Sequence, residues 1–191
     1  MKMMRQLIGV GAAIALVGGV QCAILAQSQT KPADSGEGKS GKKAVATIES
    51  RSDSHVTGTA TFQEANGKVT LTIKIEGAEP GTHAVHLHEK GDCTAPDGVS
   101  AGGHWNPTHE NHGKWTSSPF HRGDIGNIEV GPDGKGTFTL TTDLWTIGGA
   151  PETDVIGKGI IIHAKADDFT TQPTGNAGGR VGCGVVEAAK K

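Results

Sequence analysis

The clearest regular pattern in the chain is an alternation of apolar and polar residues. It runs through residues 55–64 and 68–76, and β-branched side chains are frequent in both segments. Successive side chains of a strand point to opposite faces, so the alternation predicts two strands that each bury one face. Asn66-Gly67 lies between them and is typical of a tight hairpin turn. The pattern therefore predicts a β-hairpin over residues 55–76.

Short apolar or alternating segments, separated by turn residues, continue to the end of the chain. No segment after residue 26 has the periodicity of a helix of three turns. Two connections are long, at residues 89–124 and 164–180, and loops of this length are usually functional or disordered. Many short strands of this kind predict an all-β antiparallel sandwich or barrel. The further predicted strands are residues 83–88, 125–130, 137–142, 159–163 and 181–186.

Composition agrees with this prediction and argues against some classes of partner. The 191 residues include 30 glycines but no tyrosine and only 4 phenylalanines, a balance that favours turns over long helices. The core must therefore come mainly from Val, Ile, Leu and Ala. A formal net charge of −2 gives no general reason to expect nucleic acid or anionic lipid as a partner.

The first residues have the layout of a secretory signal. Lys2 and Arg5 precede an uncharged apolar run at residues 7–20, which is shorter than the roughly 20 residues that span a bilayer. We expect a signal peptide over residues 1–26, and export to the periplasm, the cell envelope or the exterior. A membrane anchor is one alternative, and lipid attachment at Cys22 after cleavage is another.

A polar segment without apolar periodicity follows the apolar run. We expect residues 27–43 to be a flexible linker, because such a segment buries too little to offset its ordering entropy. Residues 44–191 are expected to form the folded domain. Cleavage after Cys22 would leave Cys93 and Cys183, and an even pair in an exported protein favours a disulfide. Two buried, unpaired thiols are the alternative.

Histidines supply candidate metal ligands. His86 and His88 are two residues apart in a predicted strand, so their side chains share a face and can converge on one ion. Two half-exposed histidines on a sheet would give the same pattern. The next loop adds three imidazoles and one carboxylate, a complete shell for a structural zinc ion. These are His104, His112, His121 and Asp124, and His163 ends an apolar strand from which it could approach the His86/His88 face.

Five segments together resemble copper/zinc superoxide dismutases. They are His-Ala-Val-His-Leu-His-Glu, Gly-Gly-His-Trp-Asn-Pro, His-Arg-Gly-Asp-Ile-Gly-Asn, His-Ala-Lys-Ala-Asp-Asp and Gly-Asn-Ala-Gly-Gly-Arg-Val-Gly-Cys-Gly. The resemblance covers about residues 44–187 and implies an eight-stranded antiparallel Greek-key barrel or sandwich with two long functional loops. This family is itself a known example of the sandwich architecture. The implied activity is dismutation of superoxide to oxygen and hydrogen peroxide, with copper and zinc as cofactors.

The resemblance also implies that seven side chains bind the two metals, one histidine bridging them. The copper ligands would be His86, His88, His104 and His163, and the zinc ligands would be His104, His112, His121 and Asp124.

Further roles implied by the resemblance concern residues around the metals. Asp167 would link a copper histidine, His86, to a zinc histidine, His112, and so fix both ring orientations. Arg180 would attract the superoxide anion, since a guanidinium keeps its charge at any working pH. Cys93 and Cys183 would form the disulfide within the subunit.

The sequence departs from the eukaryotic pattern around the rim of this site. The connection at 164–180 lacks the typical acidic pair and lysine, so long-range attraction of superoxide must be weaker or come from elsewhere, with Lys90 and Lys114 as candidates. The extended loop at 114–116 resembles bacterial members, so any oligomer need not use the eukaryotic dimer contact. There are two alternatives to an enzyme. One is a domain that binds metal without turnover, and the other is a β-sandwich in which zinc has a purely structural role. Relatives without turnover usually lose copper ligands or the arginine, and this chain keeps them all.

Overall fold

The alternating segments form the strands of a β-barrel in a computed structural model, which describes residues 41–190. The described residues contain nine strands and one single-turn 3-10 helix, η1. Their bounds are β1 Lys43–Ser50, β2 Thr57–Ala65, β3 Lys68–Glu76, β4 Gly81–His88, η1 Val99–Ala101, β5 Gly126–Val130, β6 Gly136–Thr142, β7 Gly159–His163, β8 Arg180–Val185 and β9 Glu187–Ala188.

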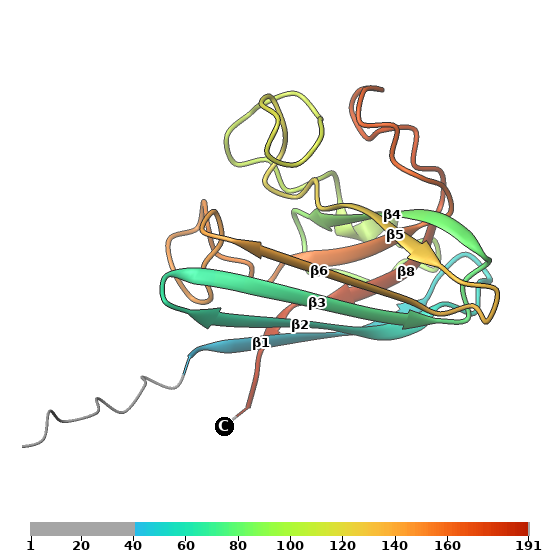
Figure 1. The fold of residues 1–191 in the computed structure, drawn as a ribbon, viewed down its shortest axis with the longest axis horizontal. Helices are drawn as coiled ribbons and strands as arrows, with labels where there is room; N and C mark the ends of the chain where they lie inside the picture. Colours follow the sequence, from blue (N-terminus) through green and yellow to red (C-terminus); the bar gives the residue numbers. More distant parts are fainter. Residues whose placement is uncertain (1–40, 191) are drawn as a thin grey trace, which may run out of the picture. The chain divides into compact units, whose positions relative to one another are not determined.

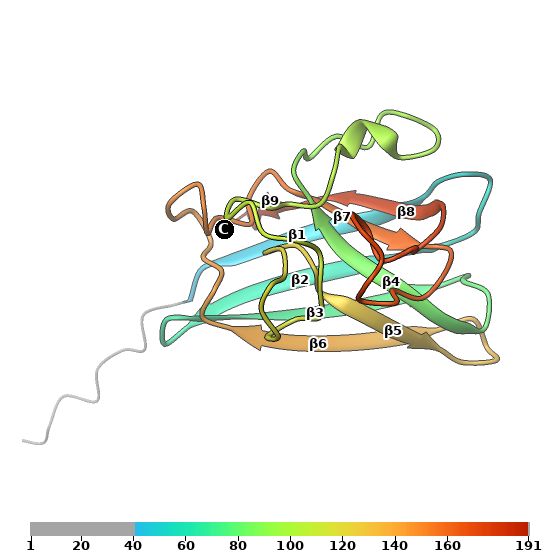
Figure 2. The same ribbon diagram turned by 90° about the horizontal axis from the view of Figure 1, so that it is seen from above.

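Eight of the strands close into one sheet. The order is β2-β3-β6-β5-β4-β7-β8-β1, and β1 also pairs with β2, so the sheet returns to its start. Every strand pairing is antiparallel, and β9 is added on the outside of β1. Figures 1 and 2 show the barrel, with two long loops projecting from one side of it. The predicted fold class is confirmed.

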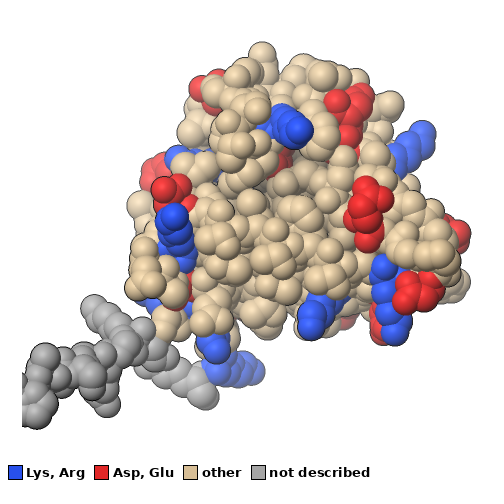
Figure 3. Space-filling view, in the orientation of Figure 1, with Lys and Arg blue, Asp and Glu red and all other residues tan. Residues whose placement is uncertain are grey.

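The core follows from the alternation that the sequence displays. In β1, β2 and β3 every second side chain is buried along the middle of each strand, and the outward positions are exposed or half-buried. Phe62 and Leu71 are fully buried in the core, and Phe62 contacts Trp145 with ring centroids 6.1 Å apart. The outward positions of β2, β3 and β6 carry mainly threonine and single charges. On the face in Figure 3 the two signs of charge are interspersed.

Two differences from the sequence prediction concern a strand and a connection of the barrel. Strand β1 was not predicted, because its core positions Ala44 and Ala46 are small and give a weak hydrophobic signal. A third long connection, residues 143–158, joins β6 to β7. The expected signal peptide and the linker up to residue 40 lie outside the described residues. Within residues 41–190 no helix is long and apolar enough to cross a membrane.

A disulfide joins Cys93 to Cys183, as expected, and it links the first long loop to β8 over a sequence separation of 90 residues. In the chain-entropy description a cross-link of this length stabilises a fold by about 4 to 5 kcal/mol. We expect the double variant Cys93→Ser/Cys183→Ser to lose free energy of unfolding of this order, measured by urea denaturation. Added reductant should lower the midpoint of the parent and leave the variant unchanged. Equal midpoints for both proteins would contradict the prediction.

Candidate metal centre

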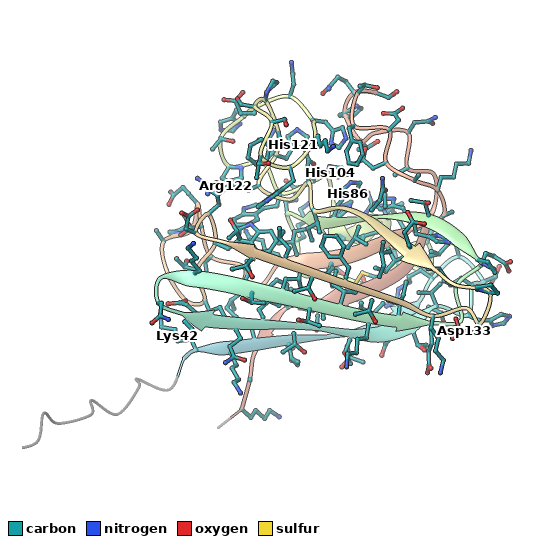
Figure 4. All side chains as sticks on the ribbon, viewed as in Figure 1. Lys42, His86, His104, His121, Arg122 and Asp133 are labelled. Atoms are coloured by element: carbon teal, nitrogen blue, oxygen red, sulfur yellow. A yellow bond between two sulfur atoms is a disulfide. The ribbon has the colours of Figure 1, made fainter. Side chains whose placement is uncertain are left out.

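Strand alternation places three histidines on the outer face of the barrel. Along β4, Val85 and Leu87 belong to the core, so His86 and His88 point to the opposite face. These strand positions are nevertheless buried, as are all residues of β7, because the long loops cover the outer face. His163 ends β7 on the same outer side. Figure 4 shows His86 there, close to His104 and His121 from the first long loop.

The first long loop (residues 89–125) is fixed to β4 by backbone hydrogen bonds on both of its arms. The Trp105 N–H donates to Leu87 O at 2.8 Å, and the Leu87 N–H donates to Gly123 O at 2.9 Å. His104 precedes one of these anchor points and Asp124 follows the other. One strand residue therefore sets the positions of two candidate ligands.

Four buried histidines converge on one point. Each offers one ring nitrogen, and the four nitrogens lie within 4.8 Å of one another. In each of the four rings one buried nitrogen has no hydrogen-bond partner, which is costly unless another group satisfies it. A transition metal that accepts imidazole ligands would do so, so this set fits a copper ion. The unpartnered atoms are His86 Nδ1, His88 Nε2, His104 Nε2 and His163 Nε2.

A second group forms around the carboxylate of Asp124, whose Oδ1 lies 2.8, 3.0 and 3.1 Å from Nδ1 of His104, His112 and His121, respectively. Ligands at 2.0–2.1 Å in a tetrahedron are about 3.3 Å apart, so these distances fit a zinc ion. The other oxygen, Oδ2, accepts the N–H groups of Gly113 and His121 at 3.0 and 2.7 Å. The loop backbone thus holds the carboxylate in place.

His104 belongs to both groups. Its Nδ1 faces Asp124, whereas its Nε2 faces His86, His88 and His163. The ring of His104 lies with its centroid 4.0 Å from that of His86 and 5.5 Å from that of His121. One imidazole therefore separates the two candidate metal positions.

A second link between the groups is the buried carboxylate of Asp167. Its Oδ2 lies 2.8 Å from His86 Nε2, and its Oδ1 lies 2.9 Å from His112 Nε2. Each ring thereby donates to Asp167 and turns its Nδ1 toward a metal position. A side chain at position 175 would collide with Asp167, and Gly175 also has a φ of +67°, so glycine is required there.

Gln172 is a site residue that the sequence prediction missed. Its side-chain amide donates to His112 O at 2.8 Å and accepts the His112 N–H at 2.9 Å. This clamp joins the second long loop (residues 164–179) to the first. The two residues are 60 positions apart, and neither a spacing nor a periodicity marks such a pair.

Burial keeps the candidate copper ligands neutral. It lowers the pKa of His86, lowers the pKa values of His88 and His163 well below 6.5, and lowers that of His104 to about 4. Neutral imidazole is the form that binds a metal ion. For Asp124, burial alone would raise the pKa, but the close contacts of its carboxylate with the rings of His104, His112 and His121 outweigh it and hold the pKa well below its usual range.

These pKa shifts predict the acid sensitivity of the protein after its metals are removed by a chelator. In the unfolded chain, histidines take up protons below about pH 6.5. In the folded chain, burial opposes protonation of His86, His88 and His163. Stability should therefore fall as the pH drops below 6.5, by up to about 1.4 kcal/mol per pH unit for each such histidine. His104, whose folded pKa is lowered to about 4, should add to this fall down to about pH 4. Urea denaturation across this range measures the slope, and a constant midpoint would contradict the prediction.

The half-buried guanidinium of Arg180 lies at the start of β8, where it pairs with His163 at the end of β7. Its Nη1 donates to Gly98 O at 2.8 Å and its Nη2 to Gly102 O at 2.7 Å. Gly102 O also lies 2.9 Å from His88 Nδ1. Arginine and a candidate copper ligand are therefore held by one carbonyl group, which places a cation beside the four-histidine group.

The two lysines considered for long-range attraction of superoxide each lie beside another side chain. Lys90 lies 4.0 Å from Glu89, and both side chains are exposed. Lys114 lies over the ring of Phe169, 5.7 Å from its centroid, and so connects the two long loops.

Comparison with known proteins agrees with this geometry. Residues 56–186 match the family of copper/zinc superoxide dismutase (SODC). The chain is 39% identical to "Superoxide dismutase [Cu-Zn] 2" of Brassica juncea over 151 residues, which cover 75% of this chain and 96% of that protein. A solved structure, that of the clock protein EA4, is similar with a TM-score of 0.70 and 34% identity, over 78% of this chain and 96% of the other. The chain therefore belongs to the copper/zinc superoxide dismutase family and is a superoxide dismutase that uses copper and zinc.

Proposed function

We propose that His86, His88, His104 and His163 hold copper, and that His104, His112, His121 and Asp124 hold zinc. The observation that carries this assignment is the orientation of His104, with Nδ1 toward Asp124 and Nε2 toward three unpartnered imidazole nitrogens. Metal analysis of the purified protein tests it directly. One copper and one zinc per chain are expected, together with catalytic removal of superoxide.

Copper, when bound, supplies the redox couple that takes an electron from one superoxide and gives it to the next, whereas zinc has no redox chemistry. The protein contributes the proton handling. His104 Nε2 takes up one proton as the first superoxide leaves as oxygen, and it gives that proton to the second superoxide. Water supplies the other proton of hydrogen peroxide. Nδ1 of His104 lies 2.8 Å from Asp124 Oδ1; with both atoms bound to zinc, the ring would stay in place while Nε2 takes up and releases the proton.

Arg180 is proposed to bind the superoxide anion beside the four-histidine group. Replacing it by alanine should lower the rate of superoxide removal by at least about tenfold, because a charge-assisted hydrogen bond contributes about 1.5 kcal/mol or more. Copper and zinc content should not change, since Arg180 is in neither ligand group. Rates of both proteins should be compared over a range of salt, where the parent should show the steeper dependence. Identical rates at low salt would exclude an anion-binding role.

The protein is further proposed to act outside the cytoplasm, in the periplasm, the cell envelope or the exterior. The support is the sequence of residues 1–26, with Lys2 and Arg5 before an uncharged apolar run, together with the disulfide, which persists in oxidising compartments. Cell fractionation and mass spectrometry of the N-terminus test this proposal. A mature chain that begins near residue 27 is expected, while an added lipid on Cys22 would indicate membrane attachment. Full-length chain in the cytoplasm would contradict export.

A further inference from the structure

A second arginine, Arg51, lies beside the disulfide. The Arg51 guanidinium donates to Cys93 O twice, from Nε at 3.0 Å and from Nη2 at 2.6 Å. A third donor, Nη1, contacts Ser50 O at 2.6 Å. Only 13% of this side chain is exposed, and the two charge-assisted hydrogen bonds to Cys93 O are partly buried, whereas the one to Ser50 O is exposed. Arg51 therefore holds the first residue of the segment 93–102, called here the disulfide loop.

The turn that contains Arg51 also holds the strand that carries Arg180. The Arg51 N–H donates to Val181 O at 3.0 Å, and the Ser54 hydroxyl donates to the same oxygen. The Ser52 N–H donates to Pro96 O at 2.9 Å, within the disulfide loop. This turn between β1 and β2 thus bonds to the disulfide loop on one side and to the residue after Arg180 on the other.

Arg180 binds the other half of the same loop, through Gly98 O and Gly102 O. The two arginine side chains meet at Gly98, which has a φ of +70°. A Cβ at this position would lie 3.4 Å from Arg180 Cβ and 3.7 Å from Arg51 Cγ. The disulfide loop is therefore held by one arginine at its start and by the other at its middle and end.

We infer that Arg51 is a positioning residue for Arg180. It fixes the disulfide loop through Cys93 O, and the carbonyls of Gly98 and Gly102 in that loop then set the direction of the Arg180 guanidinium. Without Arg51, the start of the loop keeps its disulfide but loses two charge-assisted hydrogen bonds, so the two glycine carbonyls become less well placed. This inference rests on the proposed role of Arg180 as the group that binds the substrate anion.

Azide is a suitable probe, because it is a small anion that binds Cu(II) and its binding can be followed by absorption without turnover. Arg51→Met keeps an apolar side chain beside Gly98 and removes every side-chain hydrogen-bond donor. We expect azide to bind this variant about threefold more weakly or worse at unchanged copper and zinc content. Arg51→Lys, which keeps a cation and one donor, should recover part of the loss. Glu49→Gln is the matched control, since it removes only an exposed ion pair of 3.4 Å with Arg51.

A double-mutant cycle separates the inference from a general effect on stability. If Arg51 acts through Arg180, then Arg51→Met should weaken azide binding in the parent but not in an Arg180→Ala background. A lower unfolding temperature with unchanged azide affinity would overturn the inference, as would an equal loss in both backgrounds. If Arg180→Ala alone leaves azide affinity unchanged, the proposed role of Arg180 fails, and the inference fails with it. If only Arg180→Ala has an effect, the proposed role stands and the positioning role is refuted.

Discussion

The variant His163→Ala is expected to lose superoxide removal, by at least about 100-fold, while it keeps zinc. Its Nε2 is one of four converging nitrogens without a hydrogen-bond partner, and its ring is fully buried. Under the proposed assignment, removing it would leave copper with three ligands and an open cavity in place of the fourth. Loss of a ligand should weaken metal binding by more than the 10- to 100-fold that is typical when a residue supporting a ligand is lost. His163 is not among the four candidate zinc ligands, so zinc should stay bound.

Metal content and superoxide removal should be measured on the same sample of this variant. His55→Ala provides a matched control, because His55 is exposed and belongs to neither ligand group. It should retain both metals and full activity. Full activity in a sample that contains zinc but no copper would refute the copper assignment for all four histidines.

The second large effect is expected for Asp124→Asn, which should reduce zinc affinity by at least about 100-fold. An amide keeps the shape of the side chain, but it has no charge and offers one oxygen instead of two. Oδ1 contacts the three histidines proposed to bind zinc, and Oδ2 accepts two backbone N–H groups. One substitution therefore affects both the metal ligand and the backbone contacts that hold it. We also expect a loss of several kcal/mol in the stability of the zinc-bound protein, since structural zinc contributes directly to folding energy.

Competition with a chromophoric chelator measures this zinc affinity, and thermal unfolding measures the stability. Asp133→Asn is the control, because Asp133 is exposed in the turn before β6 and lies far from the labelled histidines in Figure 4. Zinc affinity equal to that of the parent would show that Asp124 is not a ligand.

Local patterns predicted most of the barrel. The hairpin of β2 and β3 followed from strict alternation and from Asn66-Gly67, which has φ values of +52° and +73° as a tight turn requires. Strand β7 was predicted with its observed bounds, since its apolar run ends at a histidine. The sequence did not indicate β1, and it did not predict how the loops cover β4 and β7, because that depends on contacts between distant segments.

Different parts of the site were accessible to sequence analysis to different degrees. The zinc group could be proposed from ligand chemistry alone, because its four residues lie in one loop. The copper group draws on three segments, and only the family resemblance brought them together. Arg51 and Gln172 were missed, since their partners are 42 and 60 residues away and each contact uses a backbone atom. Sequence patterns carry no signal for a side chain that recognises a distant carbonyl group.

The carboxylate of Asp167, which joins His86 to His112, implies cooperative uptake of the two metals. Under the proposed assignment, zinc that orders His112 would also order Asp167, and would thereby turn His86 Nδ1 toward the copper position before copper binds. By thermodynamic linkage, any gain in copper affinity caused by zinc equals the gain in zinc affinity caused by copper. Asp167→Asn should reduce this mutual gain in titrations of each metal with and without the other. With such reciprocity the two metals could bind in either order, and the protein with both metals bound would be favoured over the protein with only one.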